Sequence, residues 1–360
     1  MSCLPLFAAA QPAGYYNSAF GKSGEQLRQA LYQVISANTV VLSYTPGLWD
    51  AYQTTDVKPN GKLWDIYSDK PGGTAAYEYT LVNDQCGSSN QNRENYCYNR
   101  EHLWPQSKFG KLSPMVSDLW IAYPTDYYVN NQRGDMPYGK VGTATKTFTN
   151  GSKIGNNIYT GAPAATCFEP IDSFKGDIAR SYFYITTRYM ADSNLFTTTG
   201  SNPTPDWEMA RKSTLKPWVI NMLLEWHHND PVSSKEKSRN DAAYALQKNR
   251  NPFIDFPQFA DCIWVGNCTG LSVPGMASIA NKIHMFPNPA VNQVTINWAE
   301  LAPDEVLAVD VVNLQGQLIY HAPAKQDRET VIPVSNWVKG FYMLQVKTQH
   351  GVQAQKLLVQ

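Results

Sequence analysis

The sequence predicts an α+β domain over residues 15–268, followed by a small all-β domain over residues 282–360. Amphipathic segments of helical period alternate with short extended segments in the first region, whereas the second consists of short β-rich runs separated by turn residues. Residues 269–281, which are rich in glycine, proline and serine, indicate a linker. A chain of 360 residues, 43% hydrophobic and 17% charged, suits a globular protein of about two domains.

The first 14 residues are interpreted as a truncated export signal. Residues 4–10 are apolar, and Ala8 and Ala10 form an Ala-x-Ala cleavage pattern before Gln11, although a charged segment in front of them is missing. The sequence contains no apolar run long enough to span a bilayer, so stable membrane insertion is not expected.

The α+β region begins with a capping-box pattern at residues 23–26, which predicts an amphipathic helix of three to four turns. Residues 44–64, with Pro46, Gly47, Pro59 and Gly61, are predicted to be irregular. The sequence predicts four further elements: a strand at 77–82, hairpins or a long loop at 136–165, and helices at 174–190 and 216–229. A second capping box at residues 233–236 opens a helix to about residue 248.

Two blocks between these elements carry the candidate chemistry. The first is residues 97–107 (CYNREHLWPQS), which should be extended because Trp104 precedes a proline. The second is residues 117–133 (SDLWIAYPTDYYVNNQR), in which an extended run ends at Pro124 and Thr125 caps a short helix to Arg133. Together they offer a carboxylate, an imidazole, amide oxygens and arginines, which are the groups that metal-assisted phosphodiester hydrolysis needs.

These blocks resemble the endonuclease I family of secreted, non-specific nucleases with a ββα-metal (His-Me finger) site. The resemblance covers roughly residues 15–265 and is carried, in the family's order, by Asn99–His102, Pro105, Ser107, Asp118-Leu119, Pro124–Asp126, Val129-Asn130, Arg133, Gly176–Arg180, Glu225–Val232, Glu236, Arg239-Asn240 and Gln247–Phe253. One such motif would be weak, but several in order are specific.

The resemblance implies a role for five residues. His102 would be the general base that takes a proton from the attacking water. Glu101 and Asn130 would bind Mg²⁺, with Mn²⁺ or Ca²⁺ as alternatives, and Arg133 or Arg100 would steady the phosphate. Arg100 and Arg133 suit structural ion pairs equally well. Neighbouring strand residues point to opposite faces, so Glu101 and His102 can share a site only where the strand ends or bends.

Two positions depart from the family pattern. Many members have a histidine pair after Asp118-Leu119, where this chain has Trp120 and Ile121, and one branch has a glutamate where this chain has Val116. Trp120 could stack on a nucleotide base or pack in the core. Arg180 is a further candidate substrate contact whose helical context also suits a structural pair.

The sequence contains six cysteines, whose pairing depends on whether the protein is exported to an oxidising compartment. Cys3 would leave with the signal. Cys86/Cys97 and Cys262/Cys268 would each close a short loop and are candidate disulfides in an exported protein, which leaves Cys167 free.

The tail predicts an immunoglobulin-like β-sandwich of about 80 residues. Its strands are expected near residues 294–298, 307–313, 318–321, 330–334, 340–346 and 353–359. Residues 286–289 (FPNP), Gly316, residues 340–342 and Lys356 resemble the C-terminal sorting domain of the type IX secretion system. A carbohydrate-binding or adhesion module is the alternative.

The sequence therefore predicts a secreted or cell-surface, metal-dependent endonuclease that acts on DNA, with RNA as an alternative substrate, through backbone contacts and uses the type IX machinery for export. The formal net charge of zero gives no bulk electrostatic sign of nucleic-acid binding. Two rivals remain: a nucleic-acid-binding or adhesion protein with weakened catalysis, and a zinc hydrolase built on His227 and His228. For that histidine pair, helix capping and packing is the favoured role.

Overall fold

The computed structural model describes residues 11–12, 14–87, 92–191, 209–211, 214–269, 282–301, 305–324, 327–348 and 351–360. The chain forms two compact units, one over Ser23–Cys268 and the other over Thr269–Gln360, with Gln11–Lys22 grouped with the second. Most of the predicted export signal and nearly all of the predicted linker fall outside the described residues, so the domain boundaries 15–268, 269–281 and 282–360 stay a prediction.

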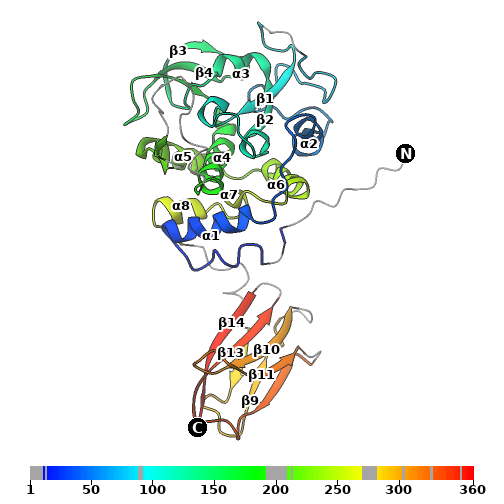
Figure 1. Cartoon of the computed structure of the whole chain (residues 1–360), viewed down its shortest axis with the longest axis vertical. Coiled ribbons are helices and arrows are strands. Elements are labelled where there is room, and N and C mark those ends of the chain that lie inside the picture. Colours follow the sequence, from blue (N-terminus) through cyan, green and yellow to red (C-terminus); the bar gives the residue numbers. More distant parts are fainter. Residues whose placement is uncertain are drawn as a thin grey trace, which may run out of the picture. The chain divides into compact units, whose positions relative to one another are not determined.

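The first unit is organised around the helix α4 (Lys175–Arg188), most of whose side chains are buried. α5 (Pro217–Asn229), α1 (Gly24–Ser36) and the short α7 (Pro252–Asp255) pack against it. α8 (Phe259–Trp264) contacts α1, and α6 (Ser234–Gln247) contacts α2 (Gly47–Thr55). In Figure 1 these helices lie on one side of the strands β1 and β2. The predicted helices at 174–190, 216–229 and 233–248 are thus confirmed within two residues.

Three local expectations were wrong. The Ser23 side chain makes no cap hydrogen bond to α1, whereas the Ser233 capping box is fully formed. Residues 44–64 contain the helix α2, because Pro46 and Gly47 stand at its start, where proline interrupts no helical hydrogen bond. Residues 77–82 form no strand. Their tyrosine hydroxyls, at Tyr77 and Tyr79, instead bond the Asp126 carboxylate.

The two chemistry-bearing blocks meet in an antiparallel pair. β1 (Tyr98–His102) pairs with β2 (Ala122–Asp126) so that Glu101 faces Tyr123 and His102 faces Ala122. Pro124 does not end β2, because the sheet has only two strands and the proline sits on an outer edge that needs no donor. The helix α3 (Tyr127–Arg133) follows at once, and Asp126 rather than Thr125 caps it, since its Oδ1 accepts from the Val129 amide at 2.9 Å.

The remaining strands of this unit lie in two small sheets. The predicted hairpin region holds β3 (Val141–Thr147) and β4 (Lys153–Asn157), and β5 (Thr166–Glu169) completes a sheet of order β3-β4-β5. β6 (Met209–Arg211) pairs with β7 (Thr214–Leu215). The described residues of this unit also contain three 3-10 turns, η1 (Gln106–Lys108), η2 (Met115–Ser117) and η3 (Asp172–Phe174).

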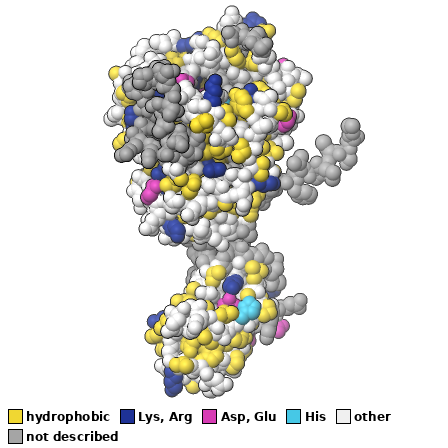
Figure 2. All heavy atoms as spheres, in the orientation of Figure 1, with side chains coloured by type: hydrophobic (Ala, Val, Ile, Leu, Met, Phe, Trp, Pro, Cys, Tyr) yellow, Lys and Arg dark blue, Asp and Glu magenta, His cyan; other side chains and the backbone are white. Residues whose placement is uncertain are grey.

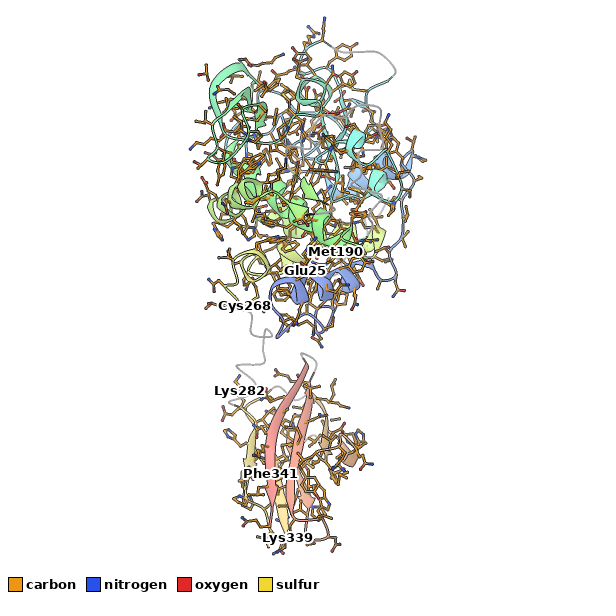
Figure 3. All side chains as sticks on the ribbon, turned by 60° about the vertical axis from the view of Figure 1, so that its left-hand side comes forward. Glu25, Met190, Cys268, Lys282, Lys339 and Phe341 are labelled. Atoms are coloured by element: carbon orange, nitrogen blue, oxygen red, sulfur yellow. A yellow bond between two sulfur atoms is a disulfide. The ribbon has the colours of Figure 1, made fainter. Side chains whose placement is uncertain are left out.

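The second unit is a sandwich of two antiparallel sheets. One has the order β11-β10-β13-β14 and the other β12-β9-β8. The strands are β8 (His284–Phe286), β9 (Gln293–Asn297), β10 (Val306–Val312), β11 (Leu318–Pro323), β12 (Glu329–Pro333), β13 (Gly340–Thr348) and β14 (Gly351–Val359). All six predicted strands are present, and only β8 was missed. Their alternating inward side chains, with Trp298 fully buried, form the core. Figure 3 marks Lys339 and Phe341 around the start of β13.

Both candidate disulfides, Cys86–Cys97 and Cys262–Cys268, are formed, and Cys167 is free and buried. No helix among the described residues is long and apolar enough to cross a membrane. On the face that Figure 2 shows, the described Lys and Arg side chains are scattered and do not gather into one basic patch, in keeping with the zero net charge.

Candidate active site

One face of β1 is covered by α3, and four polar side chains meet there. Asn99 and Glu101 are two residues apart on the strand and therefore project to the same face. Asn130 and Arg133 are three apart on α3 and therefore lie on one side of that helix. Asn130 Nδ2 donates to Asn99 Oδ1 at 2.8 Å, and Arg133 Nη1 donates to Glu101 Oε1 at 2.9 Å. The structure thus places Asn99 and Glu101 of β1 against Asn130 and Arg133 of α3.

Glu101 is buried, with an exposed fraction of 2%. Its Oε1 accepts both from Arg133 and from the Tyr67 hydroxyl, at 2.8 Å. Burial raises the pKa of the Glu101 carboxyl to about 7, and the Arg133 charge opposes that rise only in part. Among the described residues none donates to Oε2, so this oxygen keeps its acceptor capacity.

The donor chemistry of this face fits a hard divalent cation. Glu101 offers Oε2, and Asn130 offers an amide oxygen whose nitrogen is already held by Asn99. Carboxylate and amide oxygens suit Mg²⁺, which keeps several waters and needs few protein ligands. The described part of the chain holds no group of three or more His, Cys, Asp or Glu that could bind a metal. A cation held by one carboxylate and one amide requires no such group.

His102 is the last residue of β1, so its side chain lies where the strand ends. Its Nε2 lies 2.9 Å from the Val116 carbonyl oxygen, and its Nδ1 lies 2.8 Å from Gln106 Nε2. A carbonyl oxygen can only accept, so the ring carries its proton on Nε2 and Nδ1 holds the lone pair. Burial, and then the charges of Arg100 and Arg133, lower the pKa of His102 to about 4. The imidazole is therefore neutral near pH 7 and can accept a proton at Nδ1.

Arg100 lies on the same face of β1 as His102. Its guanidinium carbon sits 3.6 Å from the centre of the Tyr44 ring, and its Nη1 donates to Thr45 Oγ1 at 2.8 Å. The Tyr44 ring also contacts the His102 ring, with centroids 6.0 Å apart. Arg100 is only half-buried, so a phosphate near His102 can reach its guanidinium.

Arg133 does not fit the expected phosphate clamp. Its exposed fraction is 1%, and besides Glu101 it donates to the backbone oxygens of His102 and Leu103. A buried guanidinium with its donors aimed at Glu101 and the chain itself presents no edge to a substrate. Arg133 instead holds the Glu101 side chain in position through their ion pair.

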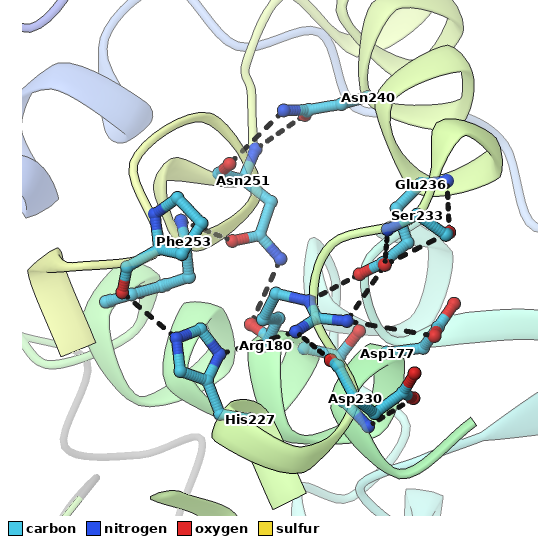
Figure 4. Close-up of polar contacts among 12 residues, drawn as sticks. Asp177, Arg180, His227, Asp230, Ser233, Glu236, Asn240, Asn251 and Phe253 are labelled. Carbon is cyan, nitrogen blue, oxygen red and sulfur yellow. Dashed lines mark hydrogen bonds and ion pairs between the residues drawn. The ribbon is translucent and has the colours of Figure 1, made fainter. Parts of the chain in front are cut away.

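Arg180 and Trp120, the expected substrate contacts, are also in the interior. Arg180 has an exposed fraction of 0% and binds Glu236 through two nitrogens, with Nη2 at 2.8 Å from Oε2, and its Nη1 donates to the Asp230 carbonyl (Figure 4). Trp120 packs against Tyr184, with ring centroids 6.0 Å apart, and below the Arg239 guanidinium. Trp120 is therefore a core residue and offers no face to a base.

The histidine pair of the zinc alternative has ordinary partners. His227 lies beside Arg180 (Figure 4), and its Nε2 is 3.1 Å from the Pro257 carbonyl oxygen. Burial lowers the pKa of His227 to about 4. His228 is exposed and bonds Asp261 at 3.0 Å. Both contacts agree with the packing and capping role, and the described residues contain no group of three or more His, Cys, Asp or Glu that could hold a metal ion.

Sequence reasoning assigned no role to three neighbours of this site: Asn99, Tyr44 and Gln106. Asn99 could have been found from strand alternation, since it shares the parity of Glu101. Gln106, four residues after His102, carried no signal beyond being an amide near an imidazole. Tyr44, 58 positions before His102, is brought to it only by the fold.

Comparisons with known proteins cover both units. Residues 23–258 match the family described as Endonuclease I, and residues 284–360 match the secretion system C-terminal sorting domain. Two curated relatives, each named extracellular ribonuclease, come from Bacillus subtilis (34% identity over 73% of this chain and 84% of the relative) and Bacillus amyloliquefaciens (35%, 69% and 78%). A solved Bacteroides vulgatus protein with an immunoglobulin-like β-sandwich aligns with 21% of this chain and 83% of its own length, at 18% identity and a TM-score of 0.19.

The sorting domain makes this a secreted or cell-surface protein. Its larger unit is a nuclease, since the Endonuclease I match extends over most of Ser23–Cys268. By that match and by its identity with the two Bacillus proteins, the chain belongs to the endonuclease I family.

Proposed function

We propose that this enzyme is a metal-dependent, non-specific endonuclease that hydrolyses DNA and also RNA, with His102 as the general base and Mg²⁺ on Glu101 and Asn130. The observation that carries this proposal is the pair of unused acceptors at the end of β1 and on α3. The Glu101 carboxylate keeps one oxygen free of protein donors, and the Asn130 amide is turned by Asn99 so that its own oxygen has no donor in the described chain.

The residues divide the chemistry as follows. His102 Nδ1 takes a proton from water as the water oxygen bonds phosphorus and the bond from phosphorus to the 3′-oxygen breaks. The Nε2–H bond to the Val116 carbonyl holds the ring in the required tautomer. Arg100 contacts the phosphate, and Arg133 holds Glu101. When bound, Mg²⁺ supplies Lewis-acid neutralisation of the charge that develops on the phosphate oxygens.

These contacts address the backbone, which carries no sequence information, so sequence preference should be slight. The mechanism needs no 2′-hydroxyl, which supports DNA as a substrate. The name extracellular ribonuclease, carried by both Bacillus relatives, supports RNA. The sorting domain supports type IX secretion machinery as the export partner.

The test is cleavage of plasmid DNA and of RNA by the full chain, in EDTA and again after Mg²⁺ is restored. Both substrates should be cut with Mg²⁺ and neither in EDTA, and Zn²⁺ should not be required. Cleavage that persists in EDTA after exhaustive dialysis would contradict the metal assignment. Cleavage of RNA alone would show that the 2′-hydroxyl takes part. Binding without any cleavage would favour the rival in which catalysis is lost.

A further inference from the structure

Two aromatic rings hold the guanidinium of Arg100. Its central carbon lies 3.6 Å from the centre of the Tyr44 ring and 4.5 Å from the centre of the Trp49 ring. At these distances the cation is attracted by the π-electrons of both rings. Tyr44 comes shortly before α2 and Trp49 lies within it, so one short stretch of chain supplies both contacts.

Trp49 is itself held in place by side chains of the core. Its ring packs edge-to-face with Tyr52 and with Tyr98, at centroid distances of 6.0 and 5.7 Å and interplanar angles of 84° and 78°. Both tyrosines are fully buried, whereas Trp49 is half-buried. Because its neighbours belong to the core, the Trp49 ring is a rigid support for the guanidinium.

The hydrogen bonds of Arg100 leave one edge of the guanidinium open. Nη1 donates to Thr45 Oγ1 at 2.8 Å and to the Tyr44 carbonyl oxygen, so its donors are used within the protein. No described residue accepts a hydrogen bond from Nε or Nη2, and neither atom is buried. The N–H groups on Nε and Nη2 point the same way in the guanidinium plane, and such a fork matches two oxygens of a phosphate.

The charge of Arg100 is also left without an acidic partner. Arg133 and Arg180 each pair with a buried glutamate, whereas no carboxylate of the described residues lies within ion-pair distance of Arg100. An unsupported arginine loses the rotamer freedom of its long side chain when it binds phosphate, which weakens binding. The rings and the Nη1 contacts restrict Arg100 before any substrate arrives.

We propose that Trp49 is a positioning residue: together with Tyr44 it holds the Arg100 guanidinium so that Nε and Nη2 form a ready fork for two non-bridging oxygens of a nucleic-acid phosphodiester. This inference rests on the proposed role of Arg100 as the phosphate contact. Trp49 acts through Arg100 and needs no contact of its own with the substrate. The ligand is the phosphodiester that DNA and RNA share, so the fork favours neither.

The kinetic test removes the supporting ring. Trp49→Leu should raise KM for DNA by about two- to fivefold, the fold-change that corresponds to a partly exposed cation–π contact. kcat should hardly change, because the fork holds the phosphate alike before and during the reaction. Trp49→Phe keeps an aromatic face and should recover most of the loss. An unchanged KM in a folded Trp49→Leu would overturn the proposal.

The matched control is Trp64→Leu, because Trp64 is another half-buried tryptophan of the nuclease unit and packs on Phe174. It should leave KM unchanged. An equal rise in KM for Trp64→Leu and Trp49→Leu would mean that general loss of packing explains both, which would overturn the positioning role.

A double-mutant cycle tests whether the effect passes through Arg100. Trp49→Leu should raise KM in the wild-type background and have no effect in the Arg100→Met background. Arg100→Lys keeps the charge and loses the fork, so it should raise KM nearly as much as Arg100→Met. Equal effects of Trp49→Leu in both backgrounds would overturn the positioning role, and a wild-type KM for Arg100→Lys would overturn the fork.

A spectroscopic readout is independent of catalysis. In metal-free protein labelled with ¹⁵N-arginine, the Nε–H resonance of Arg100, assigned by its absence from Arg100→Met, should shift when a short oligothymidylate is added. At the same oligonucleotide concentration the shift should be smaller in Trp49→Leu and unchanged in Trp64→Leu. An unmoved resonance at saturation would overturn the fork, even in an enzyme that cuts DNA with Mg²⁺. A shift in a protein that cuts neither DNA nor RNA would instead refute the proposed function and leave the fork intact.

Discussion

Arg133 and Glu101 form a buried ion pair, with Nη1 2.9 Å from Oε1 and both side chains almost without solvent contact. The same guanidinium donates to the backbone oxygens of His102 and Leu103. Arg133 of α3 therefore holds both the end of β1 and the Glu101 carboxylate in position. Arg133 thereby directs the remaining oxygen of Glu101 away from itself. Its effect on catalysis should therefore pass through Glu101.

Removal of one partner of a buried pair leaves an uncompensated charge. Arg133→Met should therefore lower the free energy of unfolding by about 3–5 kcal/mol and weaken Mg²⁺ binding. Arg100→Met is the matched change at a half-buried arginine of β1. It should lower the free energy of unfolding by only about 0.5–2 kcal/mol, as expected for loss of its contact with Tyr44, and it should raise KM. Chemical denaturation and steady-state kinetics on both variants measure this. A large KM effect for Arg133→Met without loss of stability would restore it as a phosphate contact.

The raised pKa of Glu101, about 7, predicts how metal binding depends on pH. Below pH 7 the carboxyl is protonated in the metal-free protein, so Mg²⁺ must displace a proton, whereas above pH 7 it need not. The apparent affinity for Mg²⁺ should fall about tenfold for each pH unit below 7. The rise in Tm on adding Mg²⁺ should then be clear at pH 8 and small at pH 5.5. Glu101→Gln should lose this rise at both values, and an equal rise at both in the wild type would contradict the assignment.

His102→Ala should lower kcat by about 10²–10⁴, the usual contribution of a positioned base, and leave DNA binding largely intact. His228→Ala is the matched control, because His228 is exposed and bonds only Asp261. That control should keep full activity, and loss of activity there would revive the zinc alternative. Near-full activity of a folded His102→Ala would make His102 a structural residue.

Trp120→Ala should destabilise the protein by about 3–5 kcal/mol, because it removes a large side chain that is 1% exposed. Any effect on KM should be equal for single-stranded and duplex DNA, since the ring offers no face to an unpaired base. Paired thermal unfolding and kinetics on the two substrates measure this. A KM increase confined to single-stranded DNA, in a variant of normal stability, would bring back the stacking role.

Much of the local structure is determined by local sequence. The segment that forms α4 carries an apolar stripe, α5 begins with a proline, and α6 begins with a capping box. The sandwich strands alternate with period two. Such signals depend on neighbours a few residues away. These signals failed at two prolines that were interpreted as ending regular structure. Pro46 stands at the start of α2, and Pro124 lies within β2 on its outer edge. Only the surrounding fold shows that a proline is tolerated at each position.

The motif order also predicts the chemistry proposed for the site. Glu101, His102 and Asn130 are residue types whose proposed roles follow from their donors and acceptors, and the structure places Asn130, on α3, against the face of β1 that carries Asn99 and Glu101. The same stretch of sequence predicts the helix α3, although the structure shows that Asp126, and not Thr125, caps it.

The tertiary structure alone decided which arginine can meet a substrate. Arg100, Arg133 and Arg180 are chemically identical and all lie in family-like motifs, yet Arg133 and Arg180 are buried against acidic partners and backbone oxygens, while Arg100 rests half-exposed on Tyr44. It likewise decided that Trp120 is core and that Gln106 contacts the His102 ring. Burial and pairing arise from contacts between segments far apart in the chain, such as Tyr44 with Arg100, and local sequence does not encode those distances.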